Sequence, residues 1–197
     1  MPRPPAKKTT TPAVRPNEVR IIGGQWKRTK LPVADKPGLR PTPDRVRETL
    51  FNWLGQDLSG WCCVDMFAGT GALGLEAASR GAREVQLFEA DAALVAQLLQ
   101  LKTKLGAAQV QVTRGDGAAL TGRMPAASVD LVLLDPPFDA KLYESAVTAA
   151  LRVLAPQGRL YLEASEHWGA ERLAGHGLAE LRHLKAGAVH AHLLGRA

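Results

Sequence analysis

From residue 61 onward the chain alternates short apolar runs with longer amphipathic runs, and this alternation restricts the possible fold more than any other feature. The apolar runs are WCCVDMF, EVQLFE, QVQVTRGD, VDLVLLD and RLYLEAS, and stretches with helical periodicity lie between them. Strands that are apolar almost throughout are typical of a parallel sheet covered by helices on both faces. The pattern therefore predicts an α/β fold.

Both ends of the chain depart from this alternation. At the C-terminus LAELRHLKAG and VHAHLLGR are strand-like runs with a short glycine-containing turn between them, which predicts an antiparallel pair. Before the alternation, EVRII and TKLPV predict a small hairpin, followed by a helix that begins at Pro43 with Thr42 as its cap. Residues 18–58 are thus expected to form a hairpin and helix extension, and residues 59–197 the main domain.

Composition narrows the class of protein. Hydrophobic residues make up 46% of the 197 residues and charged residues 22%, which excludes global disorder. No apolar run approaches the roughly 18 residues that span a bilayer, and the N-terminus lacks the apolar core of a signal peptide. We therefore expect a cytoplasmic protein. Cys62 and Cys63 are adjacent, so they predict core positions rather than a disulfide or a metal knuckle.

Positive charge is concentrated near the N-terminus. The first 60 residues carry a net charge of +7, against +6 for the whole chain. Residues 1–17 contain five prolines, four basic residues and no acid, so they are expected to be a disordered basic tail. Such asymmetry is typical of a protein that binds a polyanion such as nucleic acid. The candidate nucleic-acid contacts are Arg20, Lys27, Arg28, Lys30 and Arg40, with Trp26 available to stack.

A glycine motif indicates a nucleotide-like ligand. Gly69, Gly71 and Gly74 form GxGxxG between a predicted strand and a predicted helix, and Glu89 ends the next strand 20 residues after Gly69. Glycines allow close approach of the backbone, and a carboxylate at the position of Glu89 holds ribose hydroxyls. Taken alone, the motif is compatible with an NAD-dependent oxidoreductase.

Asp65 shifts the interpretation away from a dinucleotide. It lies at the end of the strand before the glycine motif, where a carboxylate repels a pyrophosphate but suits a ligand with an ammonium and a sulfonium group. S-adenosylmethionine combines these cations with a ribose and an adenine. The sequence therefore favours S-adenosylmethionine as the cofactor.

The sharpest signal is the turn Asp135-Pro136-Pro137-Phe138, directly after the apolar run VDLVLL. Successive prolines fix an extended backbone at the strand end, where ligands bind in open α/β sheets. The Asp135 carboxylate and the Pro136 carbonyl are then placed to accept hydrogen bonds from one exocyclic amine of a base, with Phe138 as a stacking surface. We predict that this turn is the catalytic element of a methyltransferase acting on a nucleobase amine.

These motifs resemble a known family. DMFAGTG, FEAD, RGDGAAL and DPPF occur in the order found in class I methyltransferases, and RIIGGQWK, KLPV, GLRPTPDRVRETLFNWL and KAGAVHAHLL are similar to the bacterial RsmD-type enzymes. The resemblance runs from about Val19 to the C-terminus. It implies a Rossmann-like fold with a mostly parallel seven-stranded sheet, and methylation of guanine N2 in small-subunit (16S) ribosomal RNA.

The resemblance also implies roles for individual residues. Asp65, Phe67, Gly69 and Gly71 match positions beside the methionine part of the cofactor, Glu89 matches the ribose contact, and Asp116 matches the contact to the adenine amine. Thr42 and Arg45, with Arg40 nearby, match the block that packs over cofactor and substrate. Asp135 to Phe138 match the catalytic turn.

Several alternatives stay open from the residues alone. An N6-adenine methyltransferase uses a similar turn, because the turn contacts only the amine, and a noncatalytic RNA-binding protein would share the basic charge. The expected partner is ribosomal RNA, either naked or in a 30S subunit or assembly intermediate, and we expect a monomer with no obligatory protein partner and no membrane contact. His190 and His192 share a strand face with His183 opposite, but no cysteine or acid stands at ligand spacing, so no metal site is expected.

Overall fold

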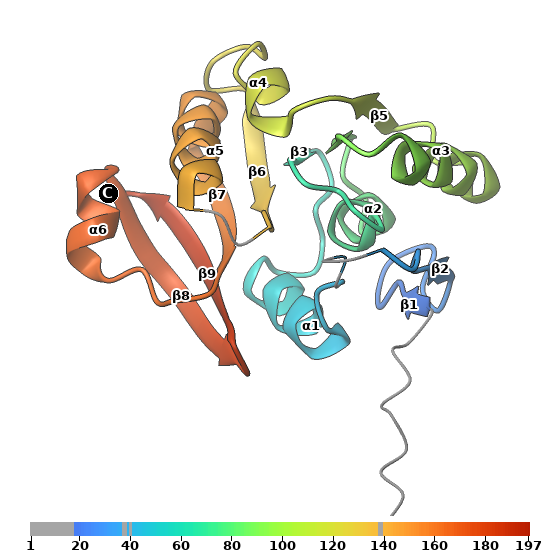
Figure 1. The fold of residues 1–197 in the computed structure, drawn as a ribbon, viewed down its shortest axis with the longest axis horizontal. Coiled ribbons are helices and arrows are strands. Elements are labelled where there is room, and N and C mark those ends of the chain that lie inside the picture. Colours follow the sequence, from blue (N-terminus) through green and yellow to red (C-terminus); the bar gives the residue numbers. More distant parts are fainter. Residues whose placement is uncertain (1–17, 37–38, 40, 138–139) are drawn as a thin grey trace, which may run out of the picture.

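A computed structural model describes residues 18–36, 39, 41–137 and 140–197, so the predicted tail, Arg40 and Phe138 lie outside the described residues. Its central sheet has seven strands in the order β5-β4-β3-β6-β7-β9-β8 (Figure 1). The strands are β3 (Cys62–Asp65), β4 (Glu84–Glu89), β5 (Val110–Arg114), β6 (Val129–Leu134), β7 (Leu154–Ala164), β8 (Leu178–Ala186) and β9 (Val189–Arg196). This order places a topological switch between β3 and β6, the position at which open α/β sheets bind ligands.

The strand directions confirm the predicted mostly parallel sheet with an antiparallel C-terminal pair. β5, β4, β3, β6 and β7 pair in parallel, whereas β9 runs antiparallel to both β7 and β8. The turn between β8 and β9 contains Gly187 at φ +63°. Asp65 pairs with Leu133, so β3 ends beside the strand that leads into Asp135.

Helices cover both faces of the sheet, as the alternation predicts. Successive strand residues point to opposite faces: Cys63 and Leu131 belong to the hydrophobic core on one face, and Val64 and Val132 to the core on the other. The first core includes α1 (Asp44–Trp53), α2 (Ala72–Ser79) and α3 (Ala92–Leu105). The second includes α4 (Gly117–Thr121), α5 (Ala140–Val153) and α6 (Ala170–Gly175). The central strands β3 and β6 are thereby buried, whereas β5 and β8 stay largely exposed.

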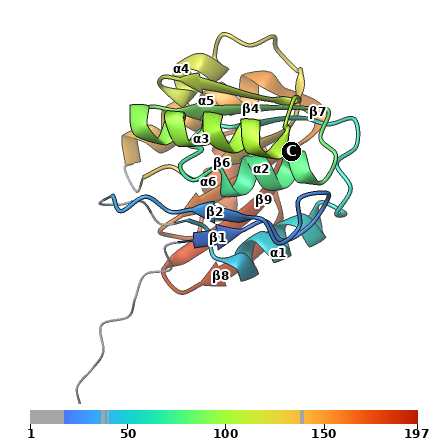
Figure 2. The same ribbon diagram turned by 90° about the vertical axis from the view of Figure 1, so that its right-hand side faces the viewer.

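The predicted N-terminal hairpin is present as β1 (Glu18–Arg20) and β2 (Lys30–Pro32), paired antiparallel. It lies beside α1 and α2 (Figure 2). Buried Glu76 on α2 accepts hydrogen bonds from the backbone N–H groups of Ile22 and Gly23, both at 2.7 Å. Because these contacts join segments more than 50 residues apart, the hairpin is held to the main sheet by polar bonds as well as by packing.

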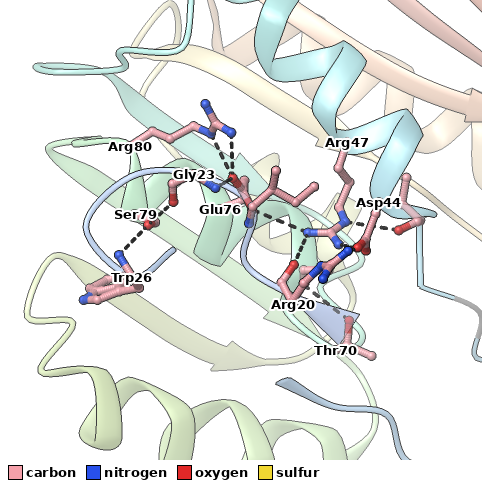
Figure 3. Close-up of polar contacts among 12 residues, drawn as sticks. Arg20, Gly23, Trp26, Asp44, Arg47, Thr70, Glu76, Ser79 and Arg80 are labelled. Carbon is pink, nitrogen blue, oxygen red and sulfur yellow. Dashed lines mark hydrogen bonds and ion pairs between the residues drawn. The ribbon is translucent and has the colours of Figure 1, made fainter. Parts of the chain in front are cut away.

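Two buried arginines complete this junction (Figure 3). Arg47 is fully buried and donates to the Arg20 carbonyl at 2.9 Å and to Asp44 at 2.6 Å, with Glu76 at 3.4 Å. Arg80 pairs with the other oxygen of Glu76 at 2.8 Å. The carboxylate of Glu76 is therefore compensated from both sides, as a buried charge must be.

The predicted cap of α1 is wrong. Pro43 is the N-cap residue, and no side chain caps the helix. Thr42 turns away from the helix, and its hydroxyl donates to Glu163 at 2.7 Å. A carboxylate is a strong hydrogen-bond acceptor, so the Thr42 hydroxyl donates to Glu163 and does not cap the helix.

Cys63 is buried in the first core, as predicted, whereas the prediction is wrong for Cys62, which is only half-buried and accepts a hydrogen bond from exposed Arg83 at 2.9 Å. Among the described residues, no helix combines the length and the apolar character required to cross a bilayer.

Candidate active site

Acidic residues stand at the carboxyl ends of five neighbouring parallel strands. Glu89 and Asp65 end β4 and β3, Asp116 and Asp135 follow β5 and β6 closely, and Glu163 is the second-last residue of β7. Because these strands are parallel and adjacent, their ends meet along one edge of the sheet. The predicted site residues from four separate motifs are thus brought together, and the edge is suited to a ligand that carries positive charge and hydroxyl groups.

The glycine loop is held in place by two of these acids. Glu89 accepts a hydrogen bond from the backbone N–H of Gly69 at 2.9 Å and one from Asp91 at 2.8 Å. Asp65 accepts from Gly74 at 3.0 Å and from Phe67 at 3.3 Å. Both carboxylates therefore shape the loop between β3 and α2 as well as facing the site.

The glycines of the motif serve different purposes. Gly69 and Gly71 adopt φ of +52° and +80°, which residues with a side chain rarely adopt. A Cβ on Gly74 would lie 2.2 Å from Leu87 Cδ2, so this glycine allows α2 to pack closely on β4. The motif thus combines a tight turn with close packing of a helix against a strand, as its sequence spacing predicts.

The predicted catalytic Asp135 lies in a cluster that the sequence did not reveal. Its Oδ2 atom is 3.4 Å from the Thr42 hydroxyl, which also donates to Glu163 at 2.7 Å. Tyr161 donates its phenol to the same Glu163 oxygen at 2.8 Å. Thr42 and Glu163 are buried, Asp135 is half-buried, and Pro136 is buried beside it. The cluster fixes the start of the DPPF turn against both α1 and β7.

The carboxyl groups in and beside this cluster have raised pKa values. Burial raises the pKa of Asp135 well above its ordinary range, and the neighbouring carboxyls of Glu163 and Asp65 raise it further. Burial also raises the pKa of Glu163, although hydrogen bonds from Thr42 and Tyr161 oppose the shift. For Asp65 burial outweighs its backbone hydrogen bonds and raises the pKa to about 7. A cation bound at this edge would relieve the repulsion among these groups.

Asp116 and Arg45 occupy more exposed positions. Asp116 caps α4 by accepting from the Ala119 N–H at 2.7 Å, and it is exposed beyond the end of β5. Arg45 is exposed on the outer face of α1, three residues from Thr42, so it lies near the cluster without being part of it. Phe67 is half-buried against the second core.

A segment before α1 covers the glycine loop. A Cβ on Gly69 would lie 3.2 Å from the Leu39 side chain, and Lys36 forms an ion pair with Asp91 at the start of α3. Of the block that the resemblance assigns to covering the cofactor, Leu39 therefore lies against the glycine loop.

The candidate RNA contacts fall into two places. Arg20 lies beside the start of α1 and pairs with Asp44 at 2.9 Å, and Lys30 pairs with Glu18 at 2.8 Å. Lys27 and Arg28 are exposed near the last turn of α2, where the N–H of half-buried Trp26 donates to Ser79. Because α2 begins at the acidic edge, its last turn lies at the far end of the helix from Asp135.

Sequence reasoning missed Glu163, Arg47 and Glu76. Each is a charged residue in apolar surroundings. Glu163 lies in RLYLEAS, Glu76 lies in ALGLEAAS, and Arg47 lies on the inner face of α1. A charge in such a place is rarely buried without a partner. This signal was available, but Arg47 meets Glu76 29 residues away and Glu163 meets Thr42 121 residues away, and only the fold reveals these pairs.

The sheet order, the glycine loop and the acidic strand ends define the Rossmann-like class I methyltransferase fold. The sequence profile of the family described as Conserved hypothetical protein 95 matches residues 19–195, and the chain belongs to this family, which is the RsmD family. The solved structure of yhhF from Escherichia coli superposes with a TM-score of 0.77 at 38% identity, covering 91% of this chain and 98% of that one.

Named relatives agree with this assignment. Ribosomal RNA small subunit methyltransferase D of Escherichia coli (strain K12) is 46% identical over 130 residues, which cover 66% of this chain and 65% of that protein. The protein of the same name from Haemophilus influenzae is 42% identical over 162 residues, 80% of this chain and 83% of the relative.

Proposed function

We propose that this chain transfers a methyl group from S-adenosylmethionine to the exocyclic N2 of a guanine in small-subunit ribosomal RNA. The observation that carries the proposal is the half-buried Asp135 of the DPPF turn, held beside Thr42 and Glu163 at the switch point of the sheet. The names of the Escherichia coli and Haemophilus influenzae relatives support ribosomal RNA as the substrate.

The residues at the acidic edge fit S-adenosylmethionine. Asp65 and Glu163 offer negative charge to a ligand with ammonium and sulfonium groups, and Glu89 retains acceptor capacity for ribose hydroxyls in addition to its two backbone bonds. Asp116 is exposed at the position expected for an adenine contact. The same acids disfavour a pyrophosphate, so an NAD-dependent oxidoreductase fits this site less well.

Bound S-adenosylmethionine supplies an electrophilic methyl group on a sulfonium, so no covalent bond to the protein is required. The protein orients the amine: Asp135 and the Pro136 carbonyl accept its two hydrogens, which directs the nitrogen lone pair toward the methyl group. When the N–C bond forms, the nitrogen becomes strongly acidic. Asp135, whose pKa burial and neighbouring carboxyls raise, is suited to receive the proton.

The geometry of the turn supports methylation of an amine in general, because Asp135 and Pro136 recognise only the amino group. The choice of guanine N2 over adenine N6 rests on the resemblance of the sequence to the RsmD-type enzymes. With a ribosomal RNA substrate, we expect the protein to act in the cytoplasm on RNA or a 30S particle, as a monomer.

The test is incubation with radiolabelled S-adenosylmethionine and, in separate reactions, naked 16S RNA, 30S particles or DNA, followed by nucleoside analysis. We expect label in N2-methylguanosine from RNA or 30S particles, and none with Asp135→Ala. Label in N6-methyladenosine would overturn the guanine assignment, and no transfer to any substrate would overturn the proposed activity.

A further inference from the structure

Four histidines gather at the C-terminal strand pair, beside the end of β7. His167 lies in the segment between β7 and α6, His183 is on β8, and His192 is its partner on β9. One ring nitrogen from each of these three lies within 4.8 Å of the others. The fourth, His190, contacts His183 with its Nδ1 atom 3.0 Å from Nε2.

A carboxylate contacts two of these three rings. Glu180 Oε2 is 2.8 Å from His192 Nδ1 and 3.1 Å from His167 Nε2. Glu180 precedes His183 by three residues, so β8 contributes both an acid and an imidazole. Three imidazoles and one carboxylate form a donor set that late first-row transition metals prefer.

We propose that His167, His183 and His192, with Glu180 as a fourth ligand, form a binding site for a divalent transition-metal ion of the Zn²⁺ class. Tetrahedral coordination at about 2.0–2.1 Å places ligand nitrogens about 3.3 Å apart, so the present separation must close by about 1.5 Å. His167 and His183 are exposed, and His167 is outside any helix or strand. Because these two side chains are exposed, they are the ones that would move to close the gap.

The buried member of the set is His192, whose Nε2 atom accepts a hydrogen bond from the Trp168 backbone N–H at 3.4 Å. Its Nδ1 atom faces Glu180, which also contacts His167. A ligating histidine usually donates its second ring N–H to an acceptor, so ligation through Nδ1 requires Nε2 to be protonated and the Trp168 contact to be released.

The site would join three separate segments. A bound ion would link the β7–α6 connection to both strands of the C-terminal pair. His192 pairs with Leu162, the residue before Glu163, so the ion would stiffen the strand that carries a member of the active-site cluster. Ligation of the native state alone raises the thermal stability.

The test is calorimetric titration of the tag-free, chelator-treated full chain with Zn²⁺, with Co²⁺ absorption as a second probe. We expect one ion per chain, visible bands typical of tetrahedral Co²⁺, and a higher melting temperature. Replacing the two exposed ligands in His167→Ala/His183→Ala should weaken binding at least about 10- to 100-fold, the loss that even an outer-sphere partner causes.

His176→Ala is the matched control, because His176 pairs with Glu144 outside the set and its loss should leave the Zn²⁺ affinity unchanged. Equal melting temperatures of wild type and double variant in chelator would show that both fold. Absence of stoichiometric binding, or undiminished binding by the double variant, would overturn the proposal. A thiolate-to-cobalt charge-transfer band would also overturn it, because it would place the ion at Cys62 or Cys63.

Discussion

The hydroxyl of Thr42 donates to the carboxylate of Glu163 at 2.7 Å, although the two residues are 121 positions apart in the chain. The same hydroxyl reaches Asp135 at 3.4 Å. This one side chain connects the segment before α1 with β7 and with the DPPF turn, and it lowers the pKa of both acids.

Thr42→Val should therefore shift the pH dependence of methylation. Without the hydroxyl the pKa values of Asp135 and Glu163 rise further, so the ionised form of Asp135 is lost at a higher pH as the pH falls. We expect the acidic limb of kcat/KM to move upward and activity near pH 7 to fall about 10- to 100-fold, in line with about 1.5–3 kcal/mol for a hydrogen bond to a charged group. Thr42→Ser should retain the wild-type profile, and an unmoved limb in Thr42→Val would contradict the assigned role.

Asp135 and Glu89 should separate catalysis from cofactor binding. Asp135→Ala removes the contact to the substrate amine, so turnover should fall by about 10²-fold or more while S-adenosylmethionine affinity stays within a few-fold. Glu89→Gln should do the opposite and weaken S-adenosylmethionine binding more than turnover. Calorimetry alongside turnover measures both quantities. Full activity of Asp135→Ala would refute the catalytic role of the turn.

The raised pKa of Asp65 predicts a pH-dependent stability. Its folded-state pKa of about 7 exceeds the ordinary value of 3.8, so the folded state binds more protons than the unfolded state between these values. The stabilisation is fully present below pH 4 and is lost as the pH rises toward 7, by roughly 4 kcal/mol in total.

Urea unfolding at several pH values, for wild type and Asp65→Asn, tests this expectation. The free energy of unfolding of wild type should fall relative to that of Asp65→Asn as the pH rises from 4 to 8. Parallel curves for the two proteins would show that the Asp65 pKa is ordinary. Saturating S-adenosylmethionine should reduce the difference, because the ligand's positive charge stabilises the carboxylate.

Glu76 should be essential for attachment of the N-terminal hairpin. Glu76→Gln leaves the buried Arg47 without full compensation, and loss of one partner of a buried ion pair typically costs about 3–5 kcal/mol. Glu48→Gln, on the exposed face of α1, is the matched control and should change stability by less than about 0.5 kcal/mol. Denaturant unfolding measures both, and equal losses in the two variants would contradict the special role of Glu76.

Lys27 and Arg28 provide a test of the basic N-terminal segment. If both contact phosphates, Lys27→Gln/Arg28→Gln should weaken RNA binding and reduce the slope of log K against log salt by about 0.7 to 0.9 per contact. Cofactor affinity should not change. Arg123→Gln/Arg182→Gln removes two exposed charges elsewhere and serves as the control. An unchanged slope in the first variant would move the RNA contacts to Arg45 and the rim of the acidic edge.

The sequence alone determined the mostly parallel sheet, the glycine loop and the place of the Asp135-Pro136-Pro137 segment after β6. These features depend on local periodicity and on the backbone preferences of glycine and proline, which act over a few residues. The C-terminal antiparallel pair and the N-terminal hairpin were likewise predictable, because each is built from neighbouring runs joined by a turn.

Only the tertiary structure decided which polar side chains meet. Thr42 was predicted as a helix cap but donates its hydroxyl to Glu163. Arg47 is buried on the inner face of α1, where it donates to the Arg20 carbonyl. His167, from the segment after β7, lies beside two histidines of β8 and β9. The energy of a buried charge or hydroxyl depends on the partner that the fold brings to it, and that partner lies far away in sequence. Local sequence patterns do not indicate which distant residues will pair.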